Sequence, residues 1–437
     1  MKVISGLLFY KGGNVERQNV LWNIAGSFCY AFASMVLAFL VMRMAGDEKG
    51  GIFSFGFSTL GQQMFIVAYF GIRPFHVTDG TGEYSFQDYL IHRYLTCFLA
   101  LGLGFLFLAA KTGLHQYSAE KSAVLFLLVA YKVMDGFADV YESEFQRQGS
   151  LYLTGKSLCF RTVLASGCFL AVLATAGNLL AACGMAAAAQ ILGIFLFNVC
   201  PGRLLGGIDR QGGQGQIVRL FQSTGLLFLS VFLDFYIFSA AKYSIDARMT
   251  DDASGYFNLI FMPTSVIYLV ANFVIRPYLT RLTALWTEAR FEEFKKQLFR
   301  IGAIIGGLTV LAVAGAALLG PWVLGIMERI LGAGYEGSLE PYAPAFVLIV
   351  LGGGLYALAN LMYYALVIMR KQKMIFYVYL RTAIGAALIS GPMVALWGIL
   401  GAACCYLLLM GVLAVSFGAG TWNTYMKEKG KHGGNRT

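Results

Sequence analysis

The sequence predicts an all-α integral membrane protein with about twelve transmembrane helices. Of its 437 residues, 58% are hydrophobic and only 13% are charged, and the mean hydropathy is +0.67. These values lie outside the range of water-soluble domains. The apolar runs are roughly 20 residues long, the length that a helix needs to cross a bilayer. We therefore expect a multi-pass protein of the cell membrane.

Twelve apolar runs can be placed along the chain. They lie at about 19–43, 51–72, 90–110, 120–144, 157–176, 179–200, 218–240, 256–276, 299–325, 343–369, 374–395 and 397–420. A Gly- and Gln-rich loop at 201–216 divides them into two groups of six, so we predict two six-helix lobes, residues 1–210 and 211–437. The segment 280–299 is amphipathic and basic, which predicts an interfacial helix at the lipid headgroups.

A short repeat supports the division into two halves. The stretch Phe70–Phe75 (FGIRPF) returns as Phe273–Tyr278 (FVIRPY), and each copy closes a long apolar run. Internal repeats are frequent in membrane transporters, so we interpret the two lobes as pseudo-symmetric. Because proline disfavours helix at the residue before it, we expect the helices to end near Arg73 and Arg276.

The distribution of basic residues predicts the orientation. With the N-terminus inside, the segments on the cytoplasmic side hold most of the Lys and Arg, such as Arg370, Lys371 and Lys373. This positive-inside pattern places both termini in the cytoplasm. It also accounts for the net charge of +10, so we expect no nucleic-acid partner.

Several charged residues fall inside the predicted spans, where a charge usually faces a cavity or a partner. Lys132, Asp135, Asp139 and Glu142 recur at three- and four-residue spacing, so they share one face of the fourth helix. Lys132 and Asp135 form either a structural ion pair or part of a cavity. Arg161 and Arg381 lie a turn or two inside the cytoplasmic boundary, where they either snorkel to the headgroups or line a substrate route.

Asp234 has no basic residue within two turns of it. It either pairs across helices or carries a proton or sodium ion, and together with Asp139 and Asp135 it forms our set of candidates for ion coupling.

Two helices carry polar stripes, which serve either as interhelical hydrogen bonds or as a binding surface. One consists of Ser54, Ser58 and Gln62, and the other of Asn258, Ser265, Asn272 and Arg276. Pro263 is expected to kink the eighth helix.

The sequence contains no signature of an enzyme. It has no zincin motif, nucleophile elbow or kinase set, and the four histidines are scattered in or beside loops. The eight cysteines lie in or at the ends of spans and lack metal-ligand spacing. We therefore expect no catalytic residue, no metal and no cofactor.

Several local stretches resemble one family. They are Gly71–Asp79, Tyr84–Tyr89, Gln146–Leu151 with Gly155-Lys156, the helix from Pro263 to Pro277, and Met369–Lys373. With these, the chain from about 15 to 425 resembles the bacterial lipid-linked oligosaccharide flippases, the polysaccharide-transport branch of the multidrug/oligosaccharidyl-lipid/polysaccharide exporter superfamily. His76 departs from the family, which has Gln there.

The resemblance implies two lobes around a central cationic cavity that opens alternately to each side. The implied cargo is an oligosaccharide on undecaprenyl pyrophosphate, moved from the inner to the outer leaflet for surface polysaccharide assembly. The implied partners are this carrier, membrane lipids and polysaccharide polymerase or assembly proteins. Arginine suits a pyrophosphate because its fork donates two parallel hydrogen bonds. Our substrate-binding candidates are Arg73, Arg276, Lys132, Arg161, Arg381, Gln62 and Asn272.

Other functions remain as alternatives. A cation-coupled multidrug exporter of the same superfamily favours acidic cavity residues, and the first span has neither an acid nor a proline. Peptidoglycan-precursor flippases usually carry two further C-terminal helices. A glycan-assembly enzyme is disfavoured by the short loops and scattered histidines, and a membrane scaffold by the charges within the spans.

Overall fold

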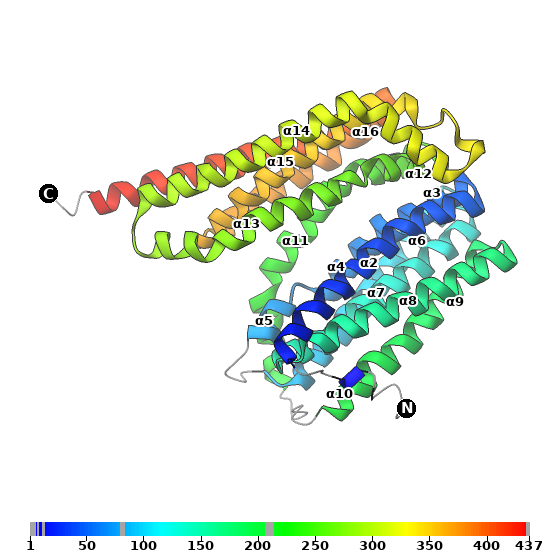
Figure 1. The fold of residues 1–437 in the computed structure, drawn as a ribbon, viewed down its shortest axis with the longest axis horizontal. Coiled ribbons are helices and arrows are strands. Elements are labelled where there is room, and N and C mark those ends of the chain that lie inside the picture. The colour runs from blue at the N-terminus through cyan, green and yellow to red at the C-terminus, as the bar shows by residue number, and fades with distance from the viewer. Residues whose placement is uncertain (1–5, 7, 11–13, 79–83, 206–213, 434–437) are drawn as a thin grey trace. The chain divides into compact units, whose positions relative to one another are not determined.

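The structure is a computed structural model that describes residues 6, 8–10, 14–78, 84–205 and 214–433. Within this part the regular structure is entirely helical. The chain forms two compact units, Met1–Phe232 and Leu233–Thr437, which are treated separately (Figure 1). The predicted boundary at 210 lies outside the described residues, and the units divide inside a helix, α11 (Gln214–Arg248).

The first unit is built around α7 (Ala119–Arg147). Around this helix pack α3 (Asp47–Phe55), α4 (Gly61–Tyr69), α5 (Arg73–Thr78), α6 (Phe86–Gly113), α8 (Leu151–Ala176) and α9 (Leu179–Ile194). The helix α2 (Val15–Ala45) lies along α8. Gly26 and Gly155 let these two backbones touch, since a Cβ on Gly26 would lie 2.4 Å from the Gly155 carbonyl oxygen.

Two π-helical segments interrupt the helices of the first unit. They are η1 (Gly56–Leu60), between α3 and α4, and η2 (Phe195–Val199), between α9 and α10 (Cys200–Leu204). A π-turn adds a residue to the turn and is frequent at functional sites. It also interrupts the regular α-helical spacing that we assumed for Ser54, Ser58 and Gln62.

The second unit is built around α15 (Ala343–Ile368). This helix packs against α12 (Asp251–Phe261), α13 (Pro263–Thr287), α14 (Phe291–Leu331) and α16 (Gln372–Gly433). The short 3-10 helices η3 (Ala333–Tyr335) and η4 (Glu340–Tyr342) connect α14 to α15. Gly398, with φ 56° and ψ −132°, breaks α16 into two helices.

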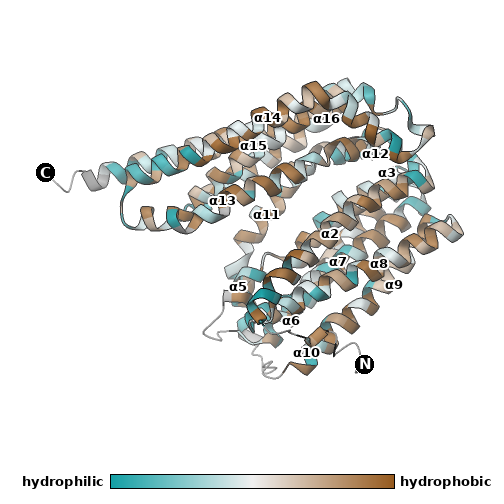
Figure 2. Cartoon of the chain, viewed as in Figure 1, coloured by the Kyte–Doolittle hydropathy of each residue, from teal (hydrophilic) through white to brown (hydrophobic). Residues whose placement is uncertain are grey.

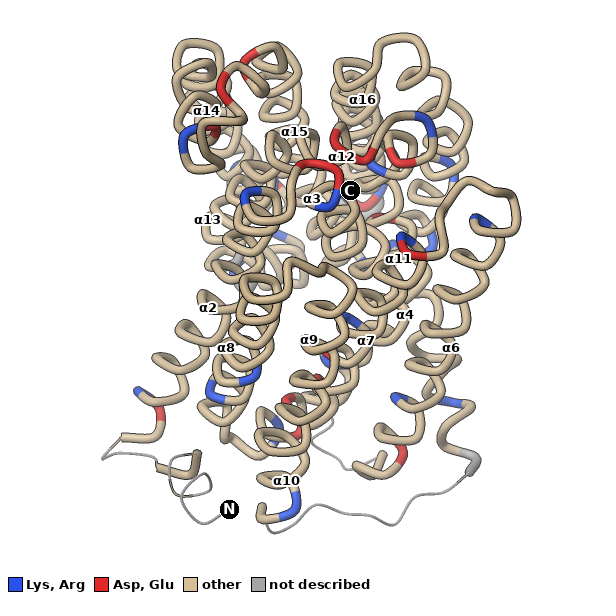
Figure 3. Tube along the Cα trace, turned by 90° about the vertical axis from the view of Figure 1, so that its right-hand side faces the viewer, with Lys and Arg blue, Asp and Glu red and all other residues tan. Residues whose placement is uncertain are grey.

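The prediction of twelve spans is confirmed. Among the described residues, nine helices are long and apolar enough to cross a membrane. The helical segment from α3 to α4 and the charge-rich α7 supply two more, and α16 counts twice because of its break at Gly398. Apolar residues run along most of α9 and α14 (Figure 2), and α9 and α15 carry no charged residue (Figure 3).

The lipid-facing surface follows from the same pattern. Large apolar side chains such as Phe98, Leu318 and Val415 are 70%, 81% and 72% exposed. In water such exposure is unfavourable, whereas in hydrocarbon it costs nothing.

The prediction of a kink at Pro263 is also confirmed, because α12 ends at Phe261 and α13 begins at Pro263.

The two copies of the repeat are not structurally equivalent. Our expectation that a helix ends near Arg276 was therefore wrong. The first copy ends a helix: Phe70 and Gly71 have φ values of +53° and +67°. In the second copy α13 continues through Pro277. Val274 stands where the first copy has Gly71, and a β-branched residue strongly disfavours positive φ. The chain therefore remains helical.

The prediction of one separate helix over 280–299 was wrong. The segment is divided between two long helices, because α13 runs to Thr287 and α14 begins at Phe291. Ala289, with φ +56°, marks the turn.

Candidate functional site

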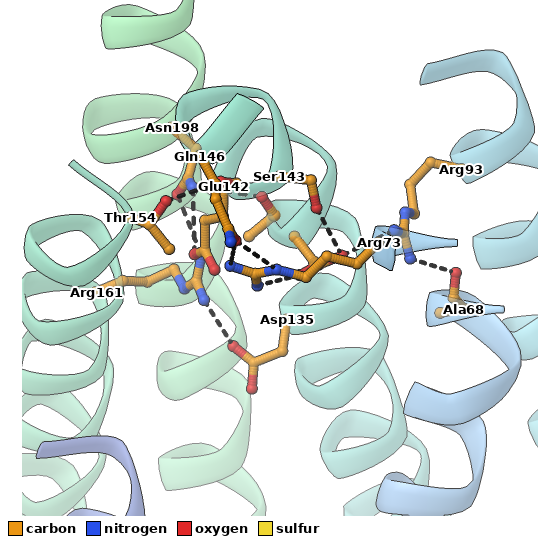
Figure 4. A network of polar contacts seen from close by, with 12 residues as sticks. Ala68, Arg73, Arg93, Asp135, Glu142, Ser143, Gln146, Thr154, Arg161 and Asn198 are labelled. Atoms are coloured by element: carbon orange, nitrogen blue, oxygen red, sulfur yellow. Dashed lines mark hydrogen bonds and ion pairs between the residues drawn. The ribbon is translucent and has the colours of Figure 1, made fainter. Parts of the chain in front are cut away.

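The candidate site lies along α7, whose buried face carries carboxylates at successive turns. Ser118 begins the helix by accepting a hydrogen bond from the Lys121 backbone N–H. Because α7 is surrounded by other helices, the face that bears Asp135, Asp139 and Glu142 is closed off from lipid. Figure 4 shows the arginines that meet this face, with Arg73 lying between Arg161 and Arg93.

Arg161 of α8 is 2% exposed and binds two carboxylates of α7. Its Nη2 lies 3.2 Å from Asp135 Oδ1, and its Nη1 lies 3.0 Å from Glu142 Oε1. Asn198, in the π-turn η2, accepts a further hydrogen bond from Nη1 at 3.1 Å. This geometry rules out Arg161 as a snorkelling anchor, because its charge is neutralised inside the unit.

Lys132 is buried, but it does not contact Asp135 directly. Its Nζ donates to the Tyr30 hydroxyl at 2.8 Å, and Tyr30 donates to Asp135 Oδ2 at 3.2 Å. The ammonium group also lies 3.7 Å from the ring centroid of Phe57. A desolvated cation over an aromatic face is stabilised by about 2 kcal/mol. Lys132 is thus held by Tyr30 and Phe57 and linked to Asp135 through a hydroxyl.

Asp139 is shared by two arginines. Arg73 Nη1 lies 2.7 Å from Asp139 Oδ1, and Arg93 Nη2 lies 3.0 Å from Oδ2. Arg93 is completely buried and also donates to the Ala68 carbonyl at 2.8 Å, whereas 27% of the Arg73 side chain is exposed. Gln146 accepts from Arg73 Nη2 at 3.0 Å. Arg73 is therefore the accessible member of the pair.

His76 forms a second polar cluster at the end of α7, outside the spans. Its Nε2 lies 2.8 Å from Glu144 Oε2, and its ring stacks on Tyr89 with centroids 3.9 Å apart. Arg147 donates to the same Glu144 at 3.0 Å. Burial lowers the pKa of His76 from its ordinary value, although the hydrogen bond to Glu144 opposes this. His76 therefore has a buried, structural environment.

Asp234 lies in the second unit among tyrosines. Tyr356 donates to Asp234 Oδ2 at 2.8 Å, and the hydroxyl of the buried Tyr379 also interacts with this carboxylate. Tyr268 stacks on Tyr356 with ring centroids 5.7 Å apart. No Lys or Arg of the described residues is ion-paired with Asp234. Of our two interpretations, an ion pair across helices is therefore not seen.

The other predicted substrate residues do not join these clusters. Arg381 is exposed and donates to its own helix at Tyr377, and Gln62 is half-buried. Asn272 is buried but donates to the Tyr268 carbonyl one turn back in α13, at 2.9 Å. The side chain of Arg276 lies outside the described residues. The role of Arg276 in substrate binding therefore remains a prediction.

Sequence reasoning missed four residues of the first cluster. Arg93 lies just inside the third predicted span and had the same signal as the charges that we selected. Tyr30, Gln190 and Asn198 are neutral, and Gln190 donates to Asp135 Oδ1 from α9. Neutral polar residues are common in membrane helices, so only their position in the structure distinguishes these three.

No protein-family model and no curated protein sequence matches the chain. Solved structures share its fold. A multidrug resistance MATE family transporter of the MOP superfamily, in an inward-facing conformation, aligns with a TM-score of 0.67 at 13% identity, over 92% of this chain and 95% of that one.

Two further MATE transporters share the fold of this chain. The eukaryotic AtDTX14 gives a TM-score of 0.60 at 14% identity over 95% of this chain and 99% of its own. A mutant of VcmN from Vibrio cholerae gives 0.58 at 13% identity over 98% of both chains. All three are transporters rather than enzymes. The protein is thus a multi-pass membrane protein with the fold of the MATE transporters of the MOP superfamily.

Proposed function

We propose that the protein is a membrane transporter that works by alternating access. The proposal is supported by the fold and by the neighbours, because multidrug resistance MATE family transporters of this fold are known in an inward-facing and in an outward-facing conformation. It is also supported by the charges buried along α7, since charges at membrane depth usually serve transport.

For the cargo, we propose a lipid-linked oligosaccharide whose carrier bears a pyrophosphate. The observation behind this proposal is Arg73, a partly exposed guanidinium in a cluster with more positive than negative groups. Four cationic side chains, Arg73, Arg93, Arg161 and Lys132, meet three carboxylates, Asp135, Asp139 and Glu142. A surplus positive charge at this depth favours an anionic ligand over a cationic one.

Multidrug export is the second candidate, and the comparisons favour it over oligosaccharide flipping, because the named neighbours include a multidrug resistance transporter. The second unit offers one observation in its favour. Asp234, a buried carboxylate among tyrosines with no ion-pair partner among the described residues, has the chemistry that binds a cation, by charge and by aromatic faces. In the flippase proposal the same carboxylate binds the coupling proton or sodium ion.

Lipid analysis of a strain that lacks the protein separates the two candidates. We expect one pyrophosphate-linked oligosaccharide to accumulate and to be protected from added extracellular glycosidase, because it remains in the inner leaflet. An unchanged lipid profile together with increased sensitivity to cationic dyes would instead establish multidrug export.

A further inference from the structure

We propose that Asp139 is an internal competitor for the anion that Arg73 binds: it occupies Arg73 in the empty transporter and is released to Arg93 when the phosphate arrives. The proposal rests on the flippase function, because it requires an anionic cargo. In this proposal the Asp139 carboxylate regulates anion binding by Arg73. Arg93, which was not among our substrate-binding candidates, is the residue that positions Asp139.

Asp139 bridges the two arginines. Its two carboxylate oxygens point to different arginines, with Oδ1 at 2.7 Å from Arg73 and Oδ2 at 3.0 Å from Arg93. Ser143 also donates to Oδ2, at 3.3 Å. If Arg73 leaves, Asp139 keeps Arg93 and Ser143 as partners, so the carboxylate is not left unpaired. An exchange at Oδ1 therefore avoids the large penalty of a bare buried charge.

The two arginines differ in how tightly their side chains are held. Arg93 is fully buried, fixed by the Ala68 carbonyl and by Asp139, and lies 5.6 Å from the ring centroid of Tyr69. Its Nε is buried without a hydrogen-bond partner among the described residues. Arg73 is 27% exposed and begins the short helix α5, directly after the left-handed turn at Phe70 and Gly71. Arg73 can meet a ligand, whereas Arg93 holds Asp139 in place.

Arg73 uses only some of its N–H donors within the unit. A guanidinium has five N–H donors. One Nη1 donor binds Asp139, and Nε and one Nη2 donor bind the Gln146 oxygen at 3.3 and 3.0 Å. Two donors, one on each Nη, have no partner among the described residues. Because a phosphate offers several oxygens to a guanidinium, it engages these donors and replaces Asp139 at the third.

The test is pyrophosphate binding to the purified full-length protein in detergent, measured by titration calorimetry at pH 7.5 and constant ionic strength. Two isosteric variants act in opposite directions. Asp139→Asn removes the competing charge, so we expect affinity for inorganic pyrophosphate to rise about tenfold. Gln146→Glu places a second competing carboxylate where the Gln146 oxygen now accepts from Arg73. We therefore expect the affinity for pyrophosphate to fall about tenfold.

Glu292→Gln is the matched control, because it also removes one negative charge but lies exposed in the other unit, where it pairs with Lys429. We expect it to leave the affinity unchanged. If Asp139→Asn folds, as judged by circular dichroism and elution volume, and binds pyrophosphate no more tightly than the wild type, the proposal is overturned. If Asp139→Asn does not fold, Gln146→Glu decides: unchanged affinity overturns the proposal, and weakened affinity supports it.

The outcome is separable from that of the flippase function. Suppose that the variants bind pyrophosphate in the predicted order of affinity but no lipid accumulates in the deletion strain. The anion site would then be supported, and the oligosaccharide cargo would be excluded. Lipid accumulation with equal affinities in all variants would retain the cargo and overturn the role of Asp139.

Discussion

Arg161 forms an ion pair with Glu142 at 3.0 Å, and this contact joins α8 to α7 inside the first unit. Both side chains are almost completely buried. Because Arg161 also binds Asp135, its guanidinium stabilises two carboxylates at once. We therefore assign Arg161 a structural role in the site, and we propose that the partly exposed Arg73 makes the substrate contact.

Replacement of this arginine tests that division. Arg161→Gln leaves two buried carboxylates without their cation, so we expect a loss of about 3–5 kcal/mol in stability, visible as a lower thermal unfolding midpoint. Arg381→Gln, the control, removes an exposed arginine and is expected to change stability by about 0.5 kcal/mol or less. Equal midpoints for the two variants would contradict the structural role.

The turn between α4 and α5 depends on the conformation of Gly71. Its φ of +67° lies in the left-handed region, and the nearest side chain, Leu227, is 3.7 Å from a Cβ placed there, so space is not limiting. Gly71→Val, which copies the second half of the repeat, should cost about 1–2 kcal/mol or more through strain alone. Gly71→Asn should cost much less, because Asn tolerates this conformation. Similar unfolding midpoints for Val and Asn would exclude strain as the cause.

His76 makes stability depend on pH. Burial lowers its pKa in the folded state, so the unfolded chain binds the proton more strongly. The stability contributed by neutral His76 is complete above about pH 6.5, the ordinary value for histidine, and is lost as the pH falls below it. We expect His76→Gln to have a flatter stability profile between pH 7 and 5, measured by thermal unfolding. A parallel profile would show that other groups cause the acid sensitivity.

Asp234 is the residue that we expect to couple transport to an ion gradient. Asp234→Asn keeps the shape and the contact with Tyr356 but removes the negative charge. In proteoliposomes, we expect this variant to lose the dependence of transport on a proton or sodium gradient. Tyr356→Phe, which keeps the carboxylate, should retain the dependence. Transport by Asp234→Asn that still follows the gradient would remove Asp234 from the coupling mechanism.

The fold was largely predictable from the sequence, because each span is marked by its length and hydropathy. The twelve predicted runs correspond to helices, and Pro263 breaks the eighth as expected. The repeat led to a wrong prediction because similar residues adopt different backbone conformations in its two copies. One glycine decides the difference: Gly71 permits a helix end, and Val274 in its place continues the helix.

The site was only partly predictable. The spacing of Asp135, Asp139 and Glu142 identified the buried face of α7 because a helix has a fixed period. The partners of that face come from other helices, and sequence spacing carries no information on which helices meet. Asn198 was missed for that reason, and so was Tyr30, whose hydroxyl lies between Lys132 and Asp135. Arg93, a charge inside a predicted span, could have been selected from the sequence.

The most direct test of the account is a flipping assay with purified protein in proteoliposomes. It compares a fluorescent oligosaccharide on polyprenyl pyrophosphate with the organic cation ethidium, and the wild type with Arg73→Gln. We predict that the wild type moves the lipid across the bilayer, that Arg73→Gln does so at least tenfold more slowly, and that neither transports ethidium. Ethidium transport by the wild type, with no movement of the lipid, would contradict the account.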